Sequence, residues 1–264
     1  MGVFLHLGIS RLDYSTESGD IIALGLGTIN PMAIIKSSSS SSFSSTSNSG
    51  TALSNAMLAN VGQVALSFIY FTYNGLFTAM FLSHEWSTYG NSPKGVRVSS
   101  QPVGDQRSTY FLQVPYRIAI PLMAASAILH WLLSQAIFLV SVEAYATDQI
   151  NDRFDAWERL PSHDILSCGY SPLAMVLLLV VGVVLLVFLA VMSSRRLASG
   201  MPVAGSCSAA ISAACHLLGS AEDLVHASER KLQWGVEVWN GFDSGHCSLS
   251  PGVVCPPQEG RVYA

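Results

Sequence analysis

The segment from Leu173 to Met192, LAMVLLLVVGVVLLVFLAVM, contains no charged, amide or hydroxyl side chain. A helix of this length is about 30 Å long, because each residue adds about 1.5 Å, and this matches the hydrocarbon core of a bilayer. A helix in a soluble protein is rarely apolar on every face. Arg195 and Arg196 follow the segment and are typical of its end at the headgroups. We therefore predict a membrane protein with a transmembrane helix at 172–192.

The composition agrees with a membrane protein. Half of the 264 residues are hydrophobic and only 11% are charged, whereas soluble domains have about 25% charged residues. The net charge of −4 gives no basic surface of the kind that binds nucleic acid, so no nucleic-acid partner is expected. Five scattered cysteines are too few for a disulfide scaffold.

Two further transmembrane helices are predicted, at 58–82 and 118–142. Each is less hydrophobic than 172–192 and carries polar residues at helical spacing on one face, which we call its polar seam. The seam of the first helix contains Asn60, Gln63, Ser67, Tyr70, Asn74 and Thr78, and that of the second contains Ser126, His130, Ser134, Gln135 and Ser141.

Loop charge predicts the orientation. The segment 83–117 has four Lys and Arg residues, 143–171 has two of them against six Asp and Glu residues, and Arg195 and Arg196 follow the third helix. By the positive-inside rule the basic loop 83–117 and the tail 193–264 lie in the cytoplasm, and the acidic loop 143–171 lies outside. The N-terminal region 1–57, which includes a flexible Ser-rich linker at 37–50, then also lies outside.

The tail begins with a second uncharged segment, 197–218, which leaves two interpretations open. It is mostly Ser, Gly and Ala, which gain little from transfer into lipid, so we favour a short amphipathic helix at 204–218 that lies against the bundle or the inner interface. The alternative is a fourth membrane span or a re-entrant segment. A fourth span would place the residues after 220 outside.

The polar seams are the first candidates for chemistry. His130, with hydroxyl groups one helical turn away, fits a proton relay or a substrate pathway. The interpretation we favour is that the seam side chains form hydrogen bonds between helices. No Asp, Glu, Lys or Arg lies inside a predicted span, so the usual mark of an ion-coupled transporter is missing from the sequence.

The tail contains soft metal ligands at Cys207, Cys215, His216, His246, Cys247 and Cys255. Zinc sites normally use cysteines two to four residues apart, and the seven residues within each cysteine pair here give no chelating turn. Free cytoplasmic thiols, with acylation near the membrane as an option, are favoured over a metal site.

The acidic loop offers Asp148, Asp152 and Asp155, whose spacing differs from that of a calcium-binding loop and is typical of a solvated face. The sequence shows no nucleophile elbow, zinc-protease motif or phosphate-binding loop. We therefore assign no catalytic, cofactor-binding or metal-ligating residue, and we expect no enzyme activity and no cofactor.

Several motifs together resemble a known family. They are STYFLQVPYR (108–117), LHWLLSQ (129–135), CGYSP (168–172), AGSCSAAISAACH (204–216), LQWG (232–235) and GHCS (245–248). From about residue 20 to its end, the chain resembles the C-terminal part of a family of fungal multi-pass membrane proteins. That family is catalogued by its N-terminal region, which is called domain of unknown function 6536. The resemblance implies a fungal source and further membrane helices upstream, and it implies no activity because the family has none established. The missing N-terminal part suggests a truncated gene model or a shortened paralogue.

The sequence thus predicts an all-α integral membrane protein with about three transmembrane helices, irregular loops and a long, partly disordered C-terminal tail. We expect a non-enzymatic subunit, scaffold or receptor-like protein, in the plasma membrane rather than an internal one. The lipid bilayer and other membrane subunits are its expected partners. The alternative is a transporter or channel component that uses the two polar seams.

Overall fold

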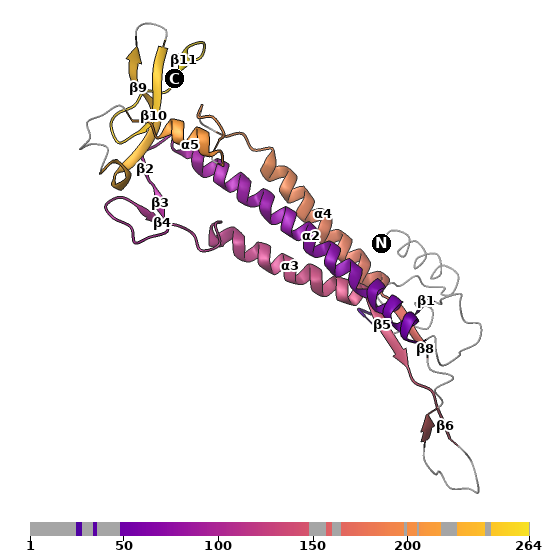
Figure 1. Ribbon diagram of the computed structural model, residues 1–264. Coiled ribbons are helices and arrows are strands. Elements are labelled where there is room, and N and C mark those ends of the chain that lie inside the picture. Colours follow the sequence, from indigo (N-terminus) through magenta and orange to yellow (C-terminus); the bar gives the residue numbers. More distant parts are fainter. Residues whose placement is uncertain are drawn as a thin grey trace. The chain divides into compact units, whose positions relative to one another are not determined.

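The computed structural model describes residues 25–27, 34–35, 48–147, 157–159, 165–197, 200–204, 206–217, 226–240 and 244–263 (Figure 1). The chain folds as two compact units, each made from two segments. Unit 1 comprises Met1–Phe71 and Met123–Phe188, and unit 2 comprises Thr72–Leu122 and Leu189–Ala264.

Three helices in the described residues are long and apolar enough to cross a membrane: α2 (Asn48–Thr88), α3 (Tyr116–Ala136) and α4 (Pro172–Ser193). The shortest, α3, has 21 residues and is about 32 Å long at 1.5 Å per residue. The prediction of three apolar helices is confirmed, and their length and composition indicate association with a membrane. Pro121 is the sixth residue of α3, inside the helix, so its missing N–H leaves the Arg117 carbonyl without its usual helical donor.

The prediction of an all-α fold is wrong, because unit 1 also contains sheets. Strand β8 (Ile165–Tyr170) pairs antiparallel with β1 (Ile34–Ile35) and with β5 (Ile137–Val142), and β6 (Tyr145–Thr147) pairs with β7 (Trp157–Arg159). The residues of β5 were expected to end the second transmembrane helix, but α3 ends at Ala136. The IFLVSV sequence of β5 is rich in β-branched residues, and a short apolar run of this kind has no period that separates strand from helix.

Unit 2 contains the larger sheet, with strand order β11-β10-β9-β2. Its strands are β2 (Lys94–Gly95), β9 (Lys231–Asn240), β10 (Ser244–Ser250) and β11 (Val262–Tyr263); the β9–β10 hairpin is antiparallel, with an irregularity between His246 and Cys247. A separate parallel pair is formed by β3 (Arg97–Val98) and β4 (Arg107–Ser108).

Three strands of this sheet lie in the tail, because β9, β10 and β11 all fall within 193–264. In β9 the buried residues Leu232, Trp234 and Val236 share one face, as expected for a strand packed on a core, and Gly235 between them is buried as well. The tail also contains the short helix α5 (Ser208–Ala214), inside the expected amphipathic segment 204–218, and the 3₁₀ turn η4 (Ala227–Glu229).

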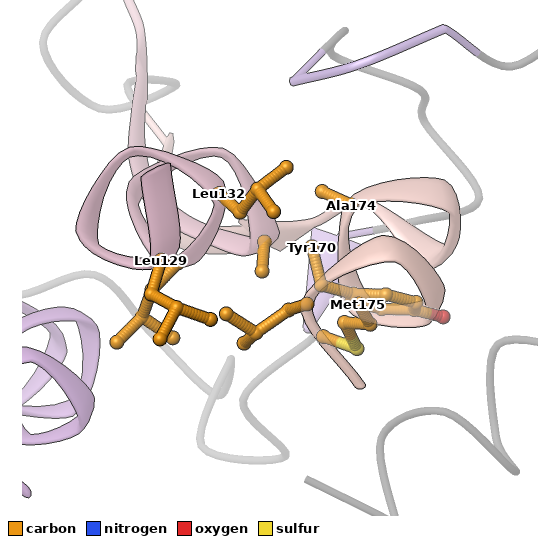
Figure 2. Close-up of a cluster of buried hydrophobic side chains, with 8 residues drawn as sticks. Leu129, Leu132, Tyr170, Ala174 and Met175 are labelled. Carbon is orange, nitrogen blue, oxygen red and sulfur yellow. The ribbon is translucent and has the colours of Figure 1, made fainter. Parts of the chain in front are cut away.

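The core of unit 1 forms where α3 and α4 meet the β5–β8 sheet. Figure 2 shows it, and its buried members are Leu129, Leu132, Leu133, Ala136, Tyr170, Ala174, Met175 and Leu178. Ser171 and Pro172 start α4 at this point: the Ala174 N–H donates to Ser171 Oγ at 3.5 Å, and proline fits the first helical position because its missing N–H would be unpaired there.

The core of unit 2 joins the basic loop to the tail. Tyr89 packs with the tail residues Met201, Ala214, Leu232, Trp234 and Leu249. The Trp234 N–H donates to the Tyr89 carbonyl at 2.9 Å, and the Trp86 indole N–H donates to the Pro202 carbonyl at 3.0 Å. The segment 83–117 and the tail therefore belong to one folded unit.

Candidate functional site

The polar seams of α2 and α3 meet in unit 1 at Gln63 and His130. Gln63 Nε2 donates to the His130 carbonyl at 3.3 Å, and Gln63 Oε1 lies 2.8 Å from His130 Nδ1. Because a side-chain amide oxygen can only accept, Nδ1 must carry a proton and donate it. The pair is part-buried and holds α2 to α3 by two hydrogen bonds, as expected for contacts between membrane helices.

The remaining hydrogen bonds of the seam hydroxyls stay within one helix. Ser67 Oγ donates to the Gln63 carbonyl at 2.9 Å, Thr78 Oγ1 to the Asn74 carbonyl at 2.9 Å and Ser134 Oγ to the Trp131 carbonyl at 2.7 Å. Asn60 Nδ2 likewise donates to Ala56, at 2.7 Å. Such bonds satisfy a polar side chain without offering it to a solute or to a neighbouring helix. Between the two seams, the hydrogen bonds of the described residues join only Gln63 and His130, since the bond from Gln135 Nε2 to Ser134 Oγ at 3.4 Å lies within α3.

A second polar link in unit 1 was not predicted from the sequence. Asn55 Nδ2 on α2 donates to the Leu166 carbonyl of β8 at 3.1 Å, and the Cys168 thiol donates to the Asn55 carbonyl at 3.3 Å. Cys168 is almost fully buried, and burial raises the pKa of its thiol. Asn55 lies before the predicted span 58–82, and no sequence pattern pointed to its partner more than a hundred residues away.

The charged site of unit 2 is centred on Glu85, near the C-terminal end of α2. Glu85 Oε1 lies 2.5 Å from Arg97 Nε and 3.5 Å from Arg107 Nη2. Arg97 also donates to the Ser108 carbonyl and to the Tyr110 hydroxyl, both at 2.9 Å, and its guanidinium lies 4.0 Å from the centre of the Tyr110 ring. Arg107 Nη2 is shielded from solvent and makes no hydrogen bond within the described residues. The carboxylate thus neutralises two basic residues of the loop 83–117, whose charge also predicts the orientation of the chain.

Tyr89 closes the other side of this site. Its hydroxyl donates to the Gly95 carbonyl at 3.2 Å, and Arg107 Nε donates to the same carbonyl at 3.0 Å. Burial raises the pKa of Tyr89, although the hydrogen bond and charge of Arg107 oppose the shift. These contacts hold the loop 83–117 against α2. The site therefore has a structural role.

The cysteines and histidines of the tail were the sequence candidates for a metal site. His246 Nε2 lies 2.6 Å from the His216 carbonyl, and the two rings are 6.1 Å apart, so the structure does bring the two histidines together. Cys207, Cys215 and Cys255 are exposed free thiols, and burial raises the pKa of the half-buried Cys247. Within the described residues, no group of three or more His, Cys, Asp and Glu side chains could hold a metal ion. The acidic candidates Asp148, Asp152 and Asp155 lie outside the described residues.

Comparison with known proteins gives one match. The family model described as Domain of unknown function (DUF8419) matches residues 29–261. The resemblance to an uncharacterised domain family is thereby confirmed at that level. No curated protein and no solved structure matches the chain.

Proposed function

Since this chain belongs to the family Domain of unknown function (DUF8419), its role has to be argued from its own residues, and we propose a non-enzymatic, multi-pass membrane protein that acts as a subunit or scaffold. In this proposal α2, α3 and α4 cross the bilayer, and the tail 193–264 is presented on one side of it. The plasma membrane is the location we propose. The lipid bilayer and the helices of other membrane subunits are the proposed partners.

The hydrogen bonding of the polar seams carries the proposal. Gln63 and His130 satisfy each other, and four further seam side chains donate to carbonyls of their own helices. A transport path needs polar groups that can exchange partners with a solute, whereas Gln63 and His130 hold α2 to α3 and the other four side chains bond within their own helices. This pattern supports a packing role for the seams.

The outward faces of the helices support a role in lipid and helix contacts. Val61, Val64 and Phe68 on α2 and Val183 and Val187 on α4 are all more than half exposed. Exposed apolar side chains on a helix long enough to span a membrane fit lipid tails or the apolar face of another membrane helix. In this proposal these faces contact lipid tails and other membrane helices.

Paired substitutions at Gln63 and His130 test the role of the seam. Gln63→Leu or His130→Leu alone leaves one polar group without its partner and should lower the stability of the detergent-solubilised protein by about 1–2 kcal/mol. The double variant removes both polar groups and should recover most of that loss, because no unpaired group remains. Thermal unfolding of the three variants and the parent measures this cycle.

The same variants distinguish the competing proposal, a transporter or channel component. A deletion strain carrying the double variant should regain whatever growth or flux property the deletion removed, if the pair only packs the helices. A double variant that folds and reaches the membrane as the parent does, yet restores nothing, would support transport. Mass measurement in native-lipid nanodiscs tests the subunit role, and a lone protomer without any membrane partner contradicts it.

We also propose the orientation given by loop charge, with 83–117 and the tail in the cytoplasm and with 1–57 and 143–171 outside. The pairing of Lys94 with Leu232 supports a common side for the loop and the tail. Glycosylation acceptors placed at 37–50, 143–171 and 240–260 test the orientation. Modification of the first two positions alone agrees with it, and modification at 240–260 contradicts it.

We also propose a narrower relationship, to fungal multi-pass membrane proteins. The motifs at 108–117, 129–135 and 204–216 support a fungal origin and a relationship to proteins with the domain of unknown function 6536. The genomic reading frame upstream of Met1 tests it. A frame that encodes further apolar spans supports the relationship, and a frame closed by stop codons contradicts it.

A further inference from the structure

We propose that the turn Tyr110–Gln113 inserts Phe111 and Leu112 into the headgroup region of the bilayer and so anchors unit 2 at the membrane surface. The inference rests on the proposed function, since it requires α2 and α3 to cross the membrane. It adds an in-plane contact with lipid that is separate from the three helices. The anchor consists of the four-residue turn before α3, and this turn is too short to span a membrane by itself.

The backbone presents two apolar side chains at the tip of the turn. The Gln113 N–H donates to the Tyr110 carbonyl at 3.2 Å, so Phe111 and Leu112 occupy the two central positions. Phe111 is 87% exposed, more than any other aromatic residue that the structure describes. Gln113 has a φ of 60°, a left-handed conformation that residues other than glycine seldom adopt. The turn keeps Phe111 and Leu112 exposed although the backbone of Gln113 is in a conformation of higher energy. An exposed apolar pair is more stable in an apolar environment than in water.

The base of the turn is held rigidly. The Tyr110 ring lies under the Arg97 guanidinium, its hydroxyl accepts a hydrogen bond from Arg97 Nη2, and its edge meets the Tyr116 ring at 6.5 Å between centroids. Arg97 is itself fixed on Glu85. The exposure of Phe111 therefore belongs to a braced turn and not to a freely moving loop.

The same contacts place the turn at the level of the membrane surface. Glu85 lies about 4.5 Å along α2 beyond Leu82, the predicted end of the first span. Tyr116, the other contact of Tyr110, is the first residue of α3. The turn is thus tied to the ends of two spans at once. The exposed Arg117 follows at the start of α3, and tyrosine and arginine at this depth are typical of membrane interfaces. These features favour lipid as the partner of the turn Tyr110–Gln113.

Tryptophan substitution in proteoliposomes of phosphatidylcholine and phosphatidylserine tests the anchor. Phe111→Trp adds a reporter at the tip, and Val103→Trp is the matched control, because Val103 is an exposed apolar residue of the same loop next to Gly104 and Asp105. The signal is the emission added to that of the parent protein. We expect Trp at 111 to be quenched more by phospholipid brominated near the headgroup than by aqueous iodide, and Trp at 103 to show the reverse order. Leu112→Trp repeats the measurement in a second position of the turn.

The outcomes separate this inference from the proposed function. If alkaline carbonate extracts the chain from membranes, the proposed function fails first. If the chain resists extraction but Trp at 111 and 112 are quenched by iodide as strongly as Trp at 103, the spans stand and the anchor is wrong. Protection of both positions from iodide and from brominated lipid alike would show that a protein surface covers the turn, which also overturns the inference.

Discussion

Replacement of Glu85 by glutamine tests whether the charged site holds unit 2 together. The carboxylate of Glu85 lies between the guanidinium groups of Arg97 and Arg107, at 2.5 and 3.5 Å. Glu85→Gln keeps the size of the side chain and removes its charge. Two guanidinium groups are then left close together without a counter-charge, and Arg97 loses one of the contacts that orient it over Tyr110.

The burial of the pair sets the expected magnitude. The side chains of Arg97 and Glu85 are 22% and 32% exposed, so they lie between the surface and the interior. Exposed ion pairs contribute up to about 1 kcal/mol, and loss of one partner from a fully buried pair costs about 3–5 kcal/mol. We therefore expect Glu85→Gln to lower the free energy of unfolding by about 1–2 kcal/mol, which is close to a tenfold change in the folding equilibrium.

Denaturant unfolding followed by tryptophan fluorescence measures this loss, because Trp86 and Trp234 lie in the core of unit 2. The control is Glu229→Gln, which removes a pair with His226 whose side chains are 38% and 63% exposed. That control should change stability by less than about 0.5 kcal/mol. Equal effects of the two variants, or no loss for Glu85→Gln, would refute the argument that the site stabilises the unit.

Two further predictions concern Gly95 and Cys247. A Cβ atom at Gly95 would lie 1.8 Å from the Asp105 carbonyl oxygen, so Gly95→Ala should break the pairing of β2 with β9 and speed amide hydrogen exchange there; Gly75→Ala, where a Cβ meets nothing within 4 Å, should leave exchange unchanged. Burial raises the pKa of the Cys247 thiol and so lowers its thiolate fraction, and iodoacetamide at mildly alkaline pH should label the exposed Cys255 before it, as mass spectrometry of digests would show. Faster labelling of Cys247 would contradict its burial.

The three long helices could be predicted because their signal is local. A run without charges that is long enough to cross a bilayer is visible in one window of sequence, as at Leu173–Met192. Helical spacing likewise predicted that Gln63 and His130 lie on polar faces, and the structure pairs them across two helices. In each case the period of a helix converts sequence spacing directly into a common face.

The sheets could not be predicted in the same way because their signal is distant. Strand β2 has two residues, and its partner in β9 lies more than a hundred residues along the chain. The alternation of Leu232, Trp234 and Val236 was present in the sequence, but an isolated strand gains little stability without its partners. In β5 the mostly apolar residues 137–142 follow those of α3 without a charged residue or a turn signal between them, so hydrophobicity alone extended the predicted helix too far.

Strand pairing also bears on whether 197–218 forms a fourth membrane span. Helix α5 has seven residues and extends only about 10 Å, a third of the bilayer core. If α3 and α4 both cross, the chain returns after α4 to the side of the loop 83–117. A third crossing within 197–218 would then place β9 on the opposite side from β2, yet Lys94 pairs with Leu232 and Tyr89 packs on Trp234. In the proposed topology the tail therefore stays on the side of the basic loop, and this contact between distant residues argues against a fourth span more strongly than the hydropathy of 197–218 does.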